Sequence, residues 1–533
     1  MRAGRLLVVL AFAGVLGLPF LVRARGERGA QGNPGPGARG PAPRLVVVTP
    51  HVEQIRSEFS GAFARWHLRE YGAEVAIDWR VPGGTSDIMK QLEAQYAAAF
   101  GAGRIGLAKG GAPRADPGTV GFDALLGGGT YEHGRLKRGI EVAGPGGART
   151  RLPLSVPAGF GAAELEGWFG ENRIGSQPLY DPDQHWLGTA LSGFGIVYNR
   201  LVLAELGLAE PRAFDDLTDP RYLGMLALAD PRQSGSVSTA YESILSTQGW
   251  DRGWRTLREM CGNARYFASA STRPPIDVSQ GEAAAGLCID FYGRGQAQTV
   301  MRPGETPGTS RVGYVDPRGA VYIDADPVSI LLGGPNPELA RRFVRFCLSE
   351  EGQALWQFRA TGSADGRGNP RGPGGEAMGP VTHELRRMPA RRVMYEKYLG
   401  AFIDPVNPFE LASEVPPAGW RPGIALVMGA MGIDTADECR AAWAALARAR
   451  EAPGFPPGAL REMEGLFYAM PPHALADGRV LTLGPGTFAE ISADLGGWKH
   501  QGRLARTRIA YTTFFRDNYR RVVELARAAP AGG

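Results

Sequence analysis

The stretch Phe194-Gly195-Ile196-Val197-Tyr198-Asn199 decides the fold class of this chain. Its aromatic and β-branched residues predict a buried strand, and a helical segment and an Asp/Pro-rich corner at 214–224 follow it. A second short strand, Leu226-Ala227-Leu228-Ala229, then runs into Ser234-Gly235-Ser236-Val237-Ser238, where a new helix can begin with its amide groups free. This order of elements predicts a crossover into a second α/β lobe that offers a site for an anionic or polar ligand.

Three strand-to-helix units precede the crossover and predict a first lobe. The first strand, at 44–49, ends at Pro50-His51, and the second, at 75–79, leads through Gly83-Gly84-Thr85-Ser86 into a helix that Thr85 or Ser86 can cap. The third unit ends in Gly127-Gly128-Gly129-Thr130. In an open parallel sheet the carboxyl ends of adjacent strands meet at one crevice, so these turns are expected to face the Ser/Gly turn after Ala229.

The chain crosses between the lobes twice. A strand at 286–292 belongs to the second lobe, and the chain returns through 321–332 to a helix at 337–348. Residues 101–117 are rich in Gly and Ala and are expected to form an insertion or mobile loop. The out-and-back path predicts a hinge made of the two crossing segments, 191–198 and 321–332.

These ordered blocks, with Pro335-Asn336-Pro337-Glu338-Leu339-Ala340 and Ser349-Glu350-Glu351-Gly352-Gln353, resemble the type 2 periplasmic solute-binding proteins of ABC importers. That class includes binders of ferric iron, thiamine, polyamines and phosphosugars. The resemblance, over roughly residues 45–360, implies an α/β fold of two lobes joined by hinge strands. Helix-prone segments at 391–402, 436–449 and 511–528 predict a mainly helical C-terminal extension, either a separate domain or helices wrapped onto the first lobe.

The domain plan that follows has six parts. We expect a signal peptide or membrane anchor at 1–25, a linker at 26–43, lobe 1 at 44–193, lobe 2 at 194–325, a return to lobe 1 at 326–380 and the extension at 381–533. The basic head Met1-Arg2-Ala3-Gly4-Arg5 before the apolar run Leu6 to Val22 is typical of a secretory signal or an uncleaved anchor. The expected location is periplasmic or extracytoplasmic, with or without a tether to the inner membrane.

Composition excludes several classes of function. The 59 Lys and Arg residues and 54 Asp and Glu residues are interspersed, which argues against nucleic acid as a partner. The motifs GK[ST], HExxH and GxSxG do not occur, so the sequence predicts no enzyme. The four cysteines (Cys261, Cys288, Cys347 and Cys439) form no CxxC pair; a Cys261–Cys288 bridge and buried free thiols remain alternatives.

The candidate ligand-binding residues come from both sides of the predicted crevice. They are His51, Thr85, Ser86, Gly129 and Thr130 in lobe 1, and Ser234, Ser236, Asp290 and Tyr292 in lobe 2. Hydroxyl groups and free backbone amides at such turns suit phosphate, sulfonate or carboxylate groups. Arg273 or Arg294 is a candidate for added positive charge.

Resemblance to the iron-binding branch of the family implies a second interpretation. That branch has a His in the first loop and two adjacent tyrosines after the strand that matches 287–289. Here the corresponding residues are Asp290-Phe291-Tyr292-Gly293, so one Tyr is kept and its neighbour is Gly293. His51, Asp290 and Tyr292 then form a partial oxygen and nitrogen set for ferric iron. The alternative is a His at the edge of the core and a Tyr that lines a cleft for an organic ligand.

The resemblance therefore implies a monomeric receptor that captures ferric iron or a small anionic or organic solute, such as a phosphorylated compound, and delivers it to ABC permease subunits. No resident cofactor and no catalysis are expected. The alternative is a membrane-tethered sensory or scaffold protein that signals through its C-terminal helices.

Overall fold

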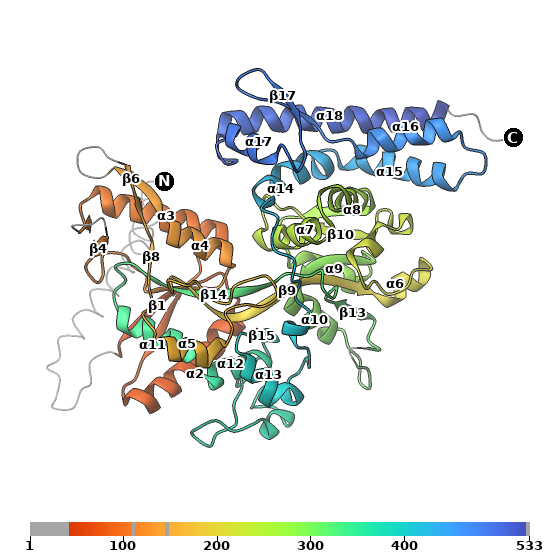
Figure 1. Cartoon of the computed structure of the whole chain (residues 1–533). Coiled ribbons are helices and arrows are strands. Elements are labelled where there is room, and N and C mark those ends of the chain that lie inside the picture. The colour runs from red at the N-terminus through yellow and green to blue at the C-terminus, as the bar shows by residue number, and fades with distance from the viewer. Residues whose placement is uncertain (1–41, 109–111, 144–148, 307, 529–533) are drawn as a thin grey trace, which may run out of the picture. The chain divides into compact units, whose positions relative to one another are not determined.

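The computed structural model describes residues 42–108, 112–143, 149–306 and 308–528. The predicted N-terminal signal or anchor and nearly all of the 26–43 linker lie outside these residues. Residues 44–533 form one compact unit, and their sheet and helices are shown in Figure 1. Among the described residues, no helix is both long and apolar enough to cross a membrane.

One mixed sheet runs through both lobes, in the strand order β11-β10-β12-β9-β14-β5-β1-β2. The strands, in chain order, are β1 (Arg44–Val48), β2 (Ala76–Arg80), β5 (Ala124–Leu126), β9 (Leu187–Asn199), β10 (Leu226–Ala229), β11 (Ala264–Ala268), β12 (Ala285–Ile289) and β14 (Ile323–Leu331). Strands β1, β2 and β5 are parallel to one another, as are β10, β11 and β12. We call the first set with its helices lobe 1 and the second set with its helices lobe 2.

Strand β9 is the element that joins the lobes. Its first half pairs antiparallel with β14, from Leu187 with Val328 to Gly193 with Ile323. Its second half pairs with β12 of lobe 2, from Phe194 with Ile289 to Tyr198 with Ala285. All 13 residues of β9 are buried, which explains why small and apolar residues predominate on both of its faces.

Helices cover both faces of the sheet in each lobe (Figure 1). In lobe 1, α2 (Glu53–Tyr71), α11 (Pro337–Cys347) and α12 (Glu350–Gln357) share one hydrophobic cluster, while α3 (Thr85–Gly101) and α4 (Thr130–Arg138) contribute to another. In lobe 2, α7 (Gly235–Gln248) and α8 (Trp250–Asn263) pack together, and α9 (Arg273–Gln280) and α10 (Asp290–Thr299) pack against β9 and β12. The predicted two-lobed α/β fold is confirmed.

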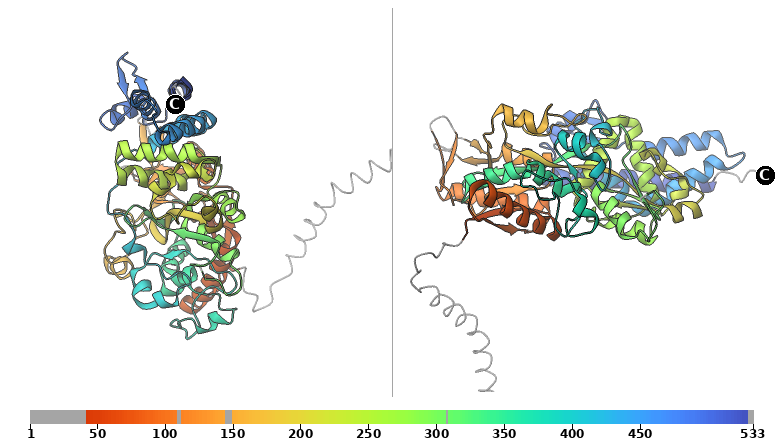
Figure 2. Two further views of the ribbon diagram at one scale, coloured as in Figure 1. Left: turned by 90° about the vertical axis from the view of Figure 1, so that its right-hand side faces the viewer. Right: turned by 90° about the horizontal axis from the view of Figure 1, so that it is seen from below.

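The C-terminal region is mainly helical, as predicted. Strand β15 (Met388–Pro389) pairs with β9, and α13 (Arg392–Tyr398) packs on α12. The chain then reaches lobe 2, where α14 (Arg421–Met428), α15 (Ala436–Glu451), α16 (Pro457–Tyr468), α17 (Phe488–Asp494) and α18 (Gln501–Ala528) follow. Of these, α15 packs on α8 and α14 on α7, and Figure 2 shows the last helices beside lobe 2 from two further directions.

The extension and lobe 2 share one hydrophobic core. Trp443 of α15 is 2% exposed, packs in the cluster that contains Leu257 of α8, and donates a hydrogen bond from Nε1 to Asn263 Oδ1 at 2.8 Å. The alternative in which the extension wraps onto the first lobe is therefore wrong from α14 onward, because the apolar faces of these helices are buried against lobe 2. The exact domain limits remain a prediction.

Four local expectations need correction. The strand expected at 286–292 ends at Ile289, and Asp290 begins α10, where its carboxylate is in the favourable first turn. Neither Thr85 nor Ser86 caps α3, whose N-cap is Gly84. The 101–117 segment contains a hairpin, β3 (Ile105–Leu107) with β4 (Pro113–Ala115). All four cysteines are buried free thiols, and Cys261 and Cys288 lie in different hydrophobic clusters, which prevents a bridge between them.

Candidate ligand cleft

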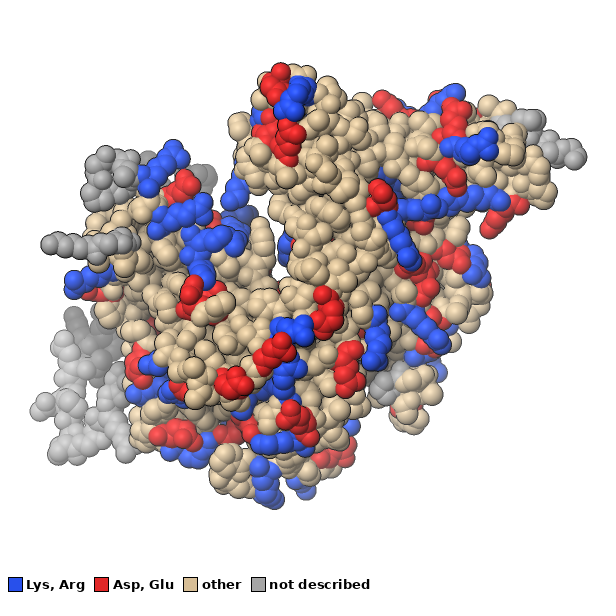
Figure 3. Space-filling model, in the orientation of Figure 1, with Lys and Arg blue, Asp and Glu red and all other residues tan. Residues whose placement is uncertain are grey.

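A cleft of about 360 Å³ lies between the two lobes. Figure 3 shows that the molecular surface is hollowed between the two lobes and that acidic and basic side chains are interspersed around this hollow. The predicted residues that line the cleft are His51, Thr85, Ser86, Gly129, Ser234, Ser236 and Tyr292. Thr130 and Asp290 are not in its lining. The lining also contains polar residues that the sequence analysis did not select, chiefly Ser192, Asp324, Asp326, Arg387 and Arg421.

Glycines allow the three turns of lobe 1 to converge on this cleft. Gly127 and Gly128 have φ angles of +94° and +104°, which favour glycine. A Cβ atom on Gly127 would lie 2.6 Å from His51 Cε1, and one on Gly128 would lie 2.9 Å from Thr85 Cγ2. The glycine run after β5 is therefore needed for close packing against the turns after β1 and β2.

His51 is held by two charged residues. Its Nε2 atom lies 3.2 Å from Asp326 Oδ2 and 2.9 Å from Arg387 Nη1, and Arg387 also forms an ion pair with Asp326. Burial and the neighbouring Arg387 hold the pKa of His51 well below its usual value, so the ring is neutral at pH 7. Nε2 thus faces both a donor, Arg387 Nη1, and an acceptor, Asp326 Oδ2, and the position of the ring proton decides which of the two it bonds. The Nδ1 atom has no hydrogen-bond partner among the described residues.

Arg387 is the main functional candidate that the sequence analysis missed. Its side chain is 6% exposed, its guanidinium carbon lies 4.2 Å from the centre of the Phe291 ring, and Nη2 is 3.3 Å from Ser192 Oγ. Burial lowers the pKa of Arg387 to about 10, which leaves it cationic at neutral pH. No local motif marks this arginine, because its partners lie far away in the sequence, from Asp326 to His51, 336 positions earlier.

The arginines expected to supply charge lie elsewhere. Arg273 bonds Asp277 one helical turn away, and Arg294 pairs with Asp316 in the interior of lobe 2. Neither lines the cleft. Arg273 is the first residue of α9 and Arg294 lies in α10, but the guanidinium groups of both residues bond acidic side chains outside the cleft lining.

Thr130 supports the cleft indirectly. Its Oγ1 donates to Asp324 Oδ1 at 2.7 Å, and its backbone N donates to Asp324 Oδ2 at 3.3 Å. Burial raises the pKa of Asp324 to about 6, and the bonds from Thr130 oppose this rise. The correction is that Thr130 positions the Asp324 carboxyl group, which itself lines the cleft.

Asp290 lies behind the cleft wall. Its side chain is fully buried, and neither carboxylate oxygen has a hydrogen-bond partner within the described part of the chain. Burial raises the pKa of Asp290 to about 7, against the opposing charge of Arg294. His51, Asp290 and Tyr292 are therefore not brought together in the lining. Among the described residues, no group of three or more His, Cys, Asp or Glu side chains is placed to hold a metal ion.

The wall formed by lobe 2 is rich in hydroxyl groups. Ser234 Oγ lies 3.1 Å from Ser236 Oγ, which lies 3.0 Å from Ser271 Oγ. Ser234 is the N-cap of α7, but its side chain makes no capping hydrogen bond. The first turn of α7 and the three hydroxyl groups thus line the same cleft as Arg387. Such a set of donors is suited to an oxyanion.

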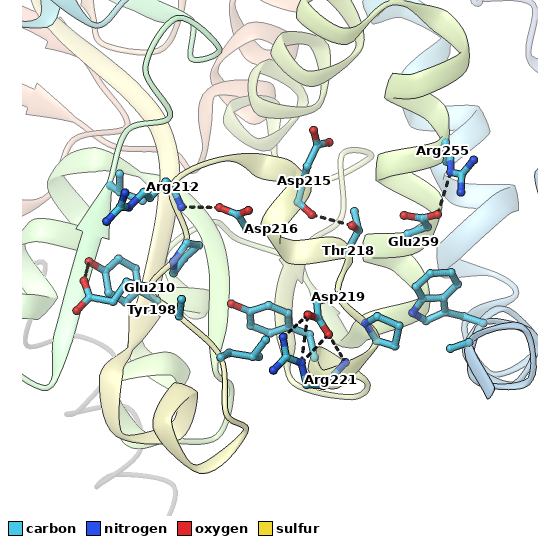
Figure 4. A pocket seen from close by; sticks show the side chains of 18 of the residues that line it. Tyr198, Glu210, Arg212, Asp215, Asp216, Thr218, Asp219, Arg221, Arg255 and Glu259 are labelled. Carbon is cyan, nitrogen blue, oxygen red and sulfur yellow. Dashed lines mark hydrogen bonds and ion pairs between the residues drawn. The ribbon is translucent and has the colours of Figure 1, made fainter. Parts of the chain in front are cut away.

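A larger groove, of about 1180 Å³, lies between lobe 2 and α15. Its charged side chains largely bond one another, as Figure 4 shows: Arg221 with Asp219 at 2.6 Å, Arg255 with Glu259 at 3.1 Å, and Tyr198 with Glu210 at 2.6 Å. The smaller cleft between the lobes is the better candidate for a ligand site, because donors from separate elements converge there.

Part of the chain is similar in sequence to known proteins. Residues 171–364 match the family described as bacterial extracellular solute-binding protein, which confirms the predicted family for that segment. The phosphoglycerate transport regulatory protein PgtC of Salmonella typhimurium is 30% identical over 182 residues, 33% of this chain and 42% of PgtC. This chain thus spans less than half the length of that relative.

Solved structures show a weaker likeness. The fructose-6-phosphate-bound periplasmic binding protein AfuA of Actinobacillus pleuropneumoniae is 20% identical, with a TM-score of 0.40 over 58% of this chain and 81% of AfuA. The ferric binding protein of Campylobacter jejuni is 14% identical, with a TM-score of 0.46 over 74% of this chain and 98% of that protein. Neither likeness bears on which ligand this chain binds.

Proposed function

We propose that this chain is an extracytoplasmic receptor that captures a small anionic organic solute, such as a phosphorylated compound, and presents it to an ABC import permease. The observation that carries the proposal is the buried, cationic Arg387 facing the hydroxyl groups of Ser234 and Ser236 across the cleft. The name of the relative PgtC, a phosphoglycerate transport regulatory protein, is in keeping with such a ligand.

An anion is a better fit to the cleft than ferric iron. Arg387 Nη1 lies 2.9 Å from the His51 nitrogen that would otherwise be available to a metal, so a metal ion would have to displace a guanidinium group that is paired with Asp326. Of the other two candidate iron ligands, Tyr292 lines the cleft and Asp290 does not. The guanidinium group of Arg387 and the serine hydroxyl groups can instead donate hydrogen bonds to a phosphate or carboxylate group.

Closure of the lobes over the solute supplies the signal for the permease. A ligand that contacts both walls favours the closed state by its extra affinity for that state. Strand β9 runs through both lobes, with β14 paired to its first half and β12 to its second, and it provides the connection about which the lobes move. This mechanism makes and breaks no covalent bond.

Ligand binding can be tested by calorimetry and thermal shift with 3-phosphoglycerate, inorganic phosphate and ferric citrate. We expect stabilisation by 3-phosphoglycerate, about 3 kcal/mol at a concentration one hundred times its Kd. The double variant S234A/S236A should weaken binding, while Arg508→Ala, in α18, should not. A visible charge-transfer band with ferric citrate that disappears in Tyr292→Phe, without any response to the anions, would establish iron as the cargo instead.

A sensory role is a second candidate. The shared core between α8 and α15 means that a movement of lobe 2 also moves the C-terminal helices. Ligand binding in the cleft can in this way alter a surface of the extension to which a partner binds. A ligand-dependent change in hydrogen exchange on the outer face of α18 would favour sensing, and its absence would favour import alone.

A further inference from the structure

The cleft contains a second arginine, which like Arg387 comes from the C-terminal extension but lies in its helical part. Arg421 is the first residue of α14 and lines the cleft with its side chain 16% exposed. The solute-binding family matches only residues 171–364, so this arginine lies outside the matched segment. The extension thus contributes both arginines to a cleft that is otherwise built by the two lobes.

Lobe 2 holds Arg421 in place. Its Nη1 atom donates to Thr239 Oγ1 at 2.8 Å and to Glu242 Oε2 at 3.1 Å, and Nη2 donates to the Gly235 carbonyl oxygen at 3.2 Å. All three acceptors belong to α7. A guanidinium group has five N–H donors, and within the described residues Nε and one Nη2 hydrogen have no acceptor. The orientation is therefore fixed while donor capacity remains.

The same guanidinium group faces lobe 1. It lies 5.0 Å from the centre of the Tyr131 ring in α4, and its charge acts to lower the pKa of Asp324. A Cβ atom on Gly235, beside Arg421, would lie only 3.3 Å from Glu132 Oε1 of α4. Arg421 consequently stands at the point where α4 of lobe 1 approaches the start of α7 of lobe 2.

Arg387 and Arg421 occupy different walls of one cleft. Arg387 is fixed by Asp326 and His51 near the joining strands, whereas Arg421 is fixed by α7 at the start of lobe 2. Each arginine retains a nitrogen without an acceptor among the described residues, Nε of Arg387 and Nε of Arg421. Two separate cationic groups match a ligand with two separate anionic groups better than one with a single charge.

We propose that Arg421 is a specificity-determining residue that binds a second anionic group of the solute, so that the chain selects small compounds with two anionic groups, such as a phosphate and a carboxylate. This inference rests on the proposed function and narrows its ligand class. It also gives the extension a direct role in ligand selection.

The test is calorimetric titration with two probes that differ in one charged group, 3-phosphoglycerate and glycerol 3-phosphate. We expect wild type to bind 3-phosphoglycerate about 10- to 100-fold more tightly, the range of one hydrogen-bonded charge. Arg421→Ala should bind the two probes about equally. Arg508→Ala is the matched control, since it removes an arginine of the extension that pairs with Asp434 away from the cleft.

A second variant separates ligand contact from structural support. Glu242→Gln removes the ion pair of Arg421 but keeps the guanidinium group, and it should retain the preference for 3-phosphoglycerate. Two results would overturn the role of Arg421 and leave the receptor function standing. One is the same preference for 3-phosphoglycerate over glycerol 3-phosphate in wild type and Arg421→Ala. The other is a preference that is lost in Glu242→Gln but kept in Arg421→Ala. If wild type binds neither probe, the proposed function fails, and this inference fails with it.

Discussion

The ion pair between Arg387 and Asp326 gives the sharpest test of how the cleft is built. Their side chains are 6% and 3% exposed, so neither charge is solvated by bulk water when its partner is removed. Breaking one partner of such a buried pair costs about 3–5 kcal/mol, because the other charge stays buried and uncompensated. We expect a loss of this size for Arg387→Met and for Asp326→Asn.

The double variant R387M/D326N should lose much less than the sum of the two single variants. Both charges are then absent, and Met can occupy the space between Phe291 and Trp356 that the arginine side chain fills. The coupling free energy between the two positions should therefore be at least about 2 kcal/mol. This value distinguishes a real pair from two residues that are merely near each other.

Hydrogen exchange measured by mass spectrometry on peptides that cover β9 and β14 gives the free energy of opening where the pair lies. The variant Arg508→Met is a suitable control, since its pair with Asp434 is half exposed on the arginine side and should contribute at most about 1 kcal/mol. The reasoning is refuted if the double variant loses as much stability as the two single variants together, within about 0.5 kcal/mol, because Arg387 and Asp326 then do not interact in the folded protein.

Three further predictions concern pH, the extension and the glycine run. Burial raises the pKa of Asp290 to about 7, so the cost of ionising this buried carboxyl group destabilises the folded state progressively as the pH rises from about 4 to 7. Asp290→Asn should therefore stabilise the protein by up to about 3 kcal/mol more at pH 8 than at pH 5; a melting-temperature difference that is the same at both pH values would contradict this. Trp443→Ala should cost about 3–5 kcal/mol and expose α15 and α18 to proteolysis, and unchanged protection would show that this contact does not hold the extension. Gly127→Ala should displace His51 and weaken binding of 3-phosphoglycerate, whereas Gly118→Ala, also at positive φ but with nothing within 4 Å of the new Cβ, should affect stability alone; equal binding in both variants would count against the packing argument.

Much of the fold could be predicted from local patterns. The strands β1, β9 and β14 were expected within a few residues because apolar and β-branched runs bounded by Gly, Pro and Asp have few other structures available. The helices α13, α15 and α18 were expected from their periodicity. The start of α10 was missed, because Asp290-Phe291-Tyr292 continues the apolar pattern of β12 and only tertiary packing ends the strand at Ile289.

The site was predicted only in part. The residues that were predicted lie on turns directly after strands, whereas those that were missed contact partners far away in the sequence. The turns that carry His51, Thr85, Ser86, Gly129, Ser234 and Ser236 follow strands, and parallel strands bring such turns to one edge, so chain order by itself placed them at the cleft. The charge of the cleft was decided by tertiary structure. Arg387 meets His51 across 336 positions, and Arg421 meets Thr239 across 182. No local pattern predicts such contacts, because they depend on where the folded extension returns to the lobes.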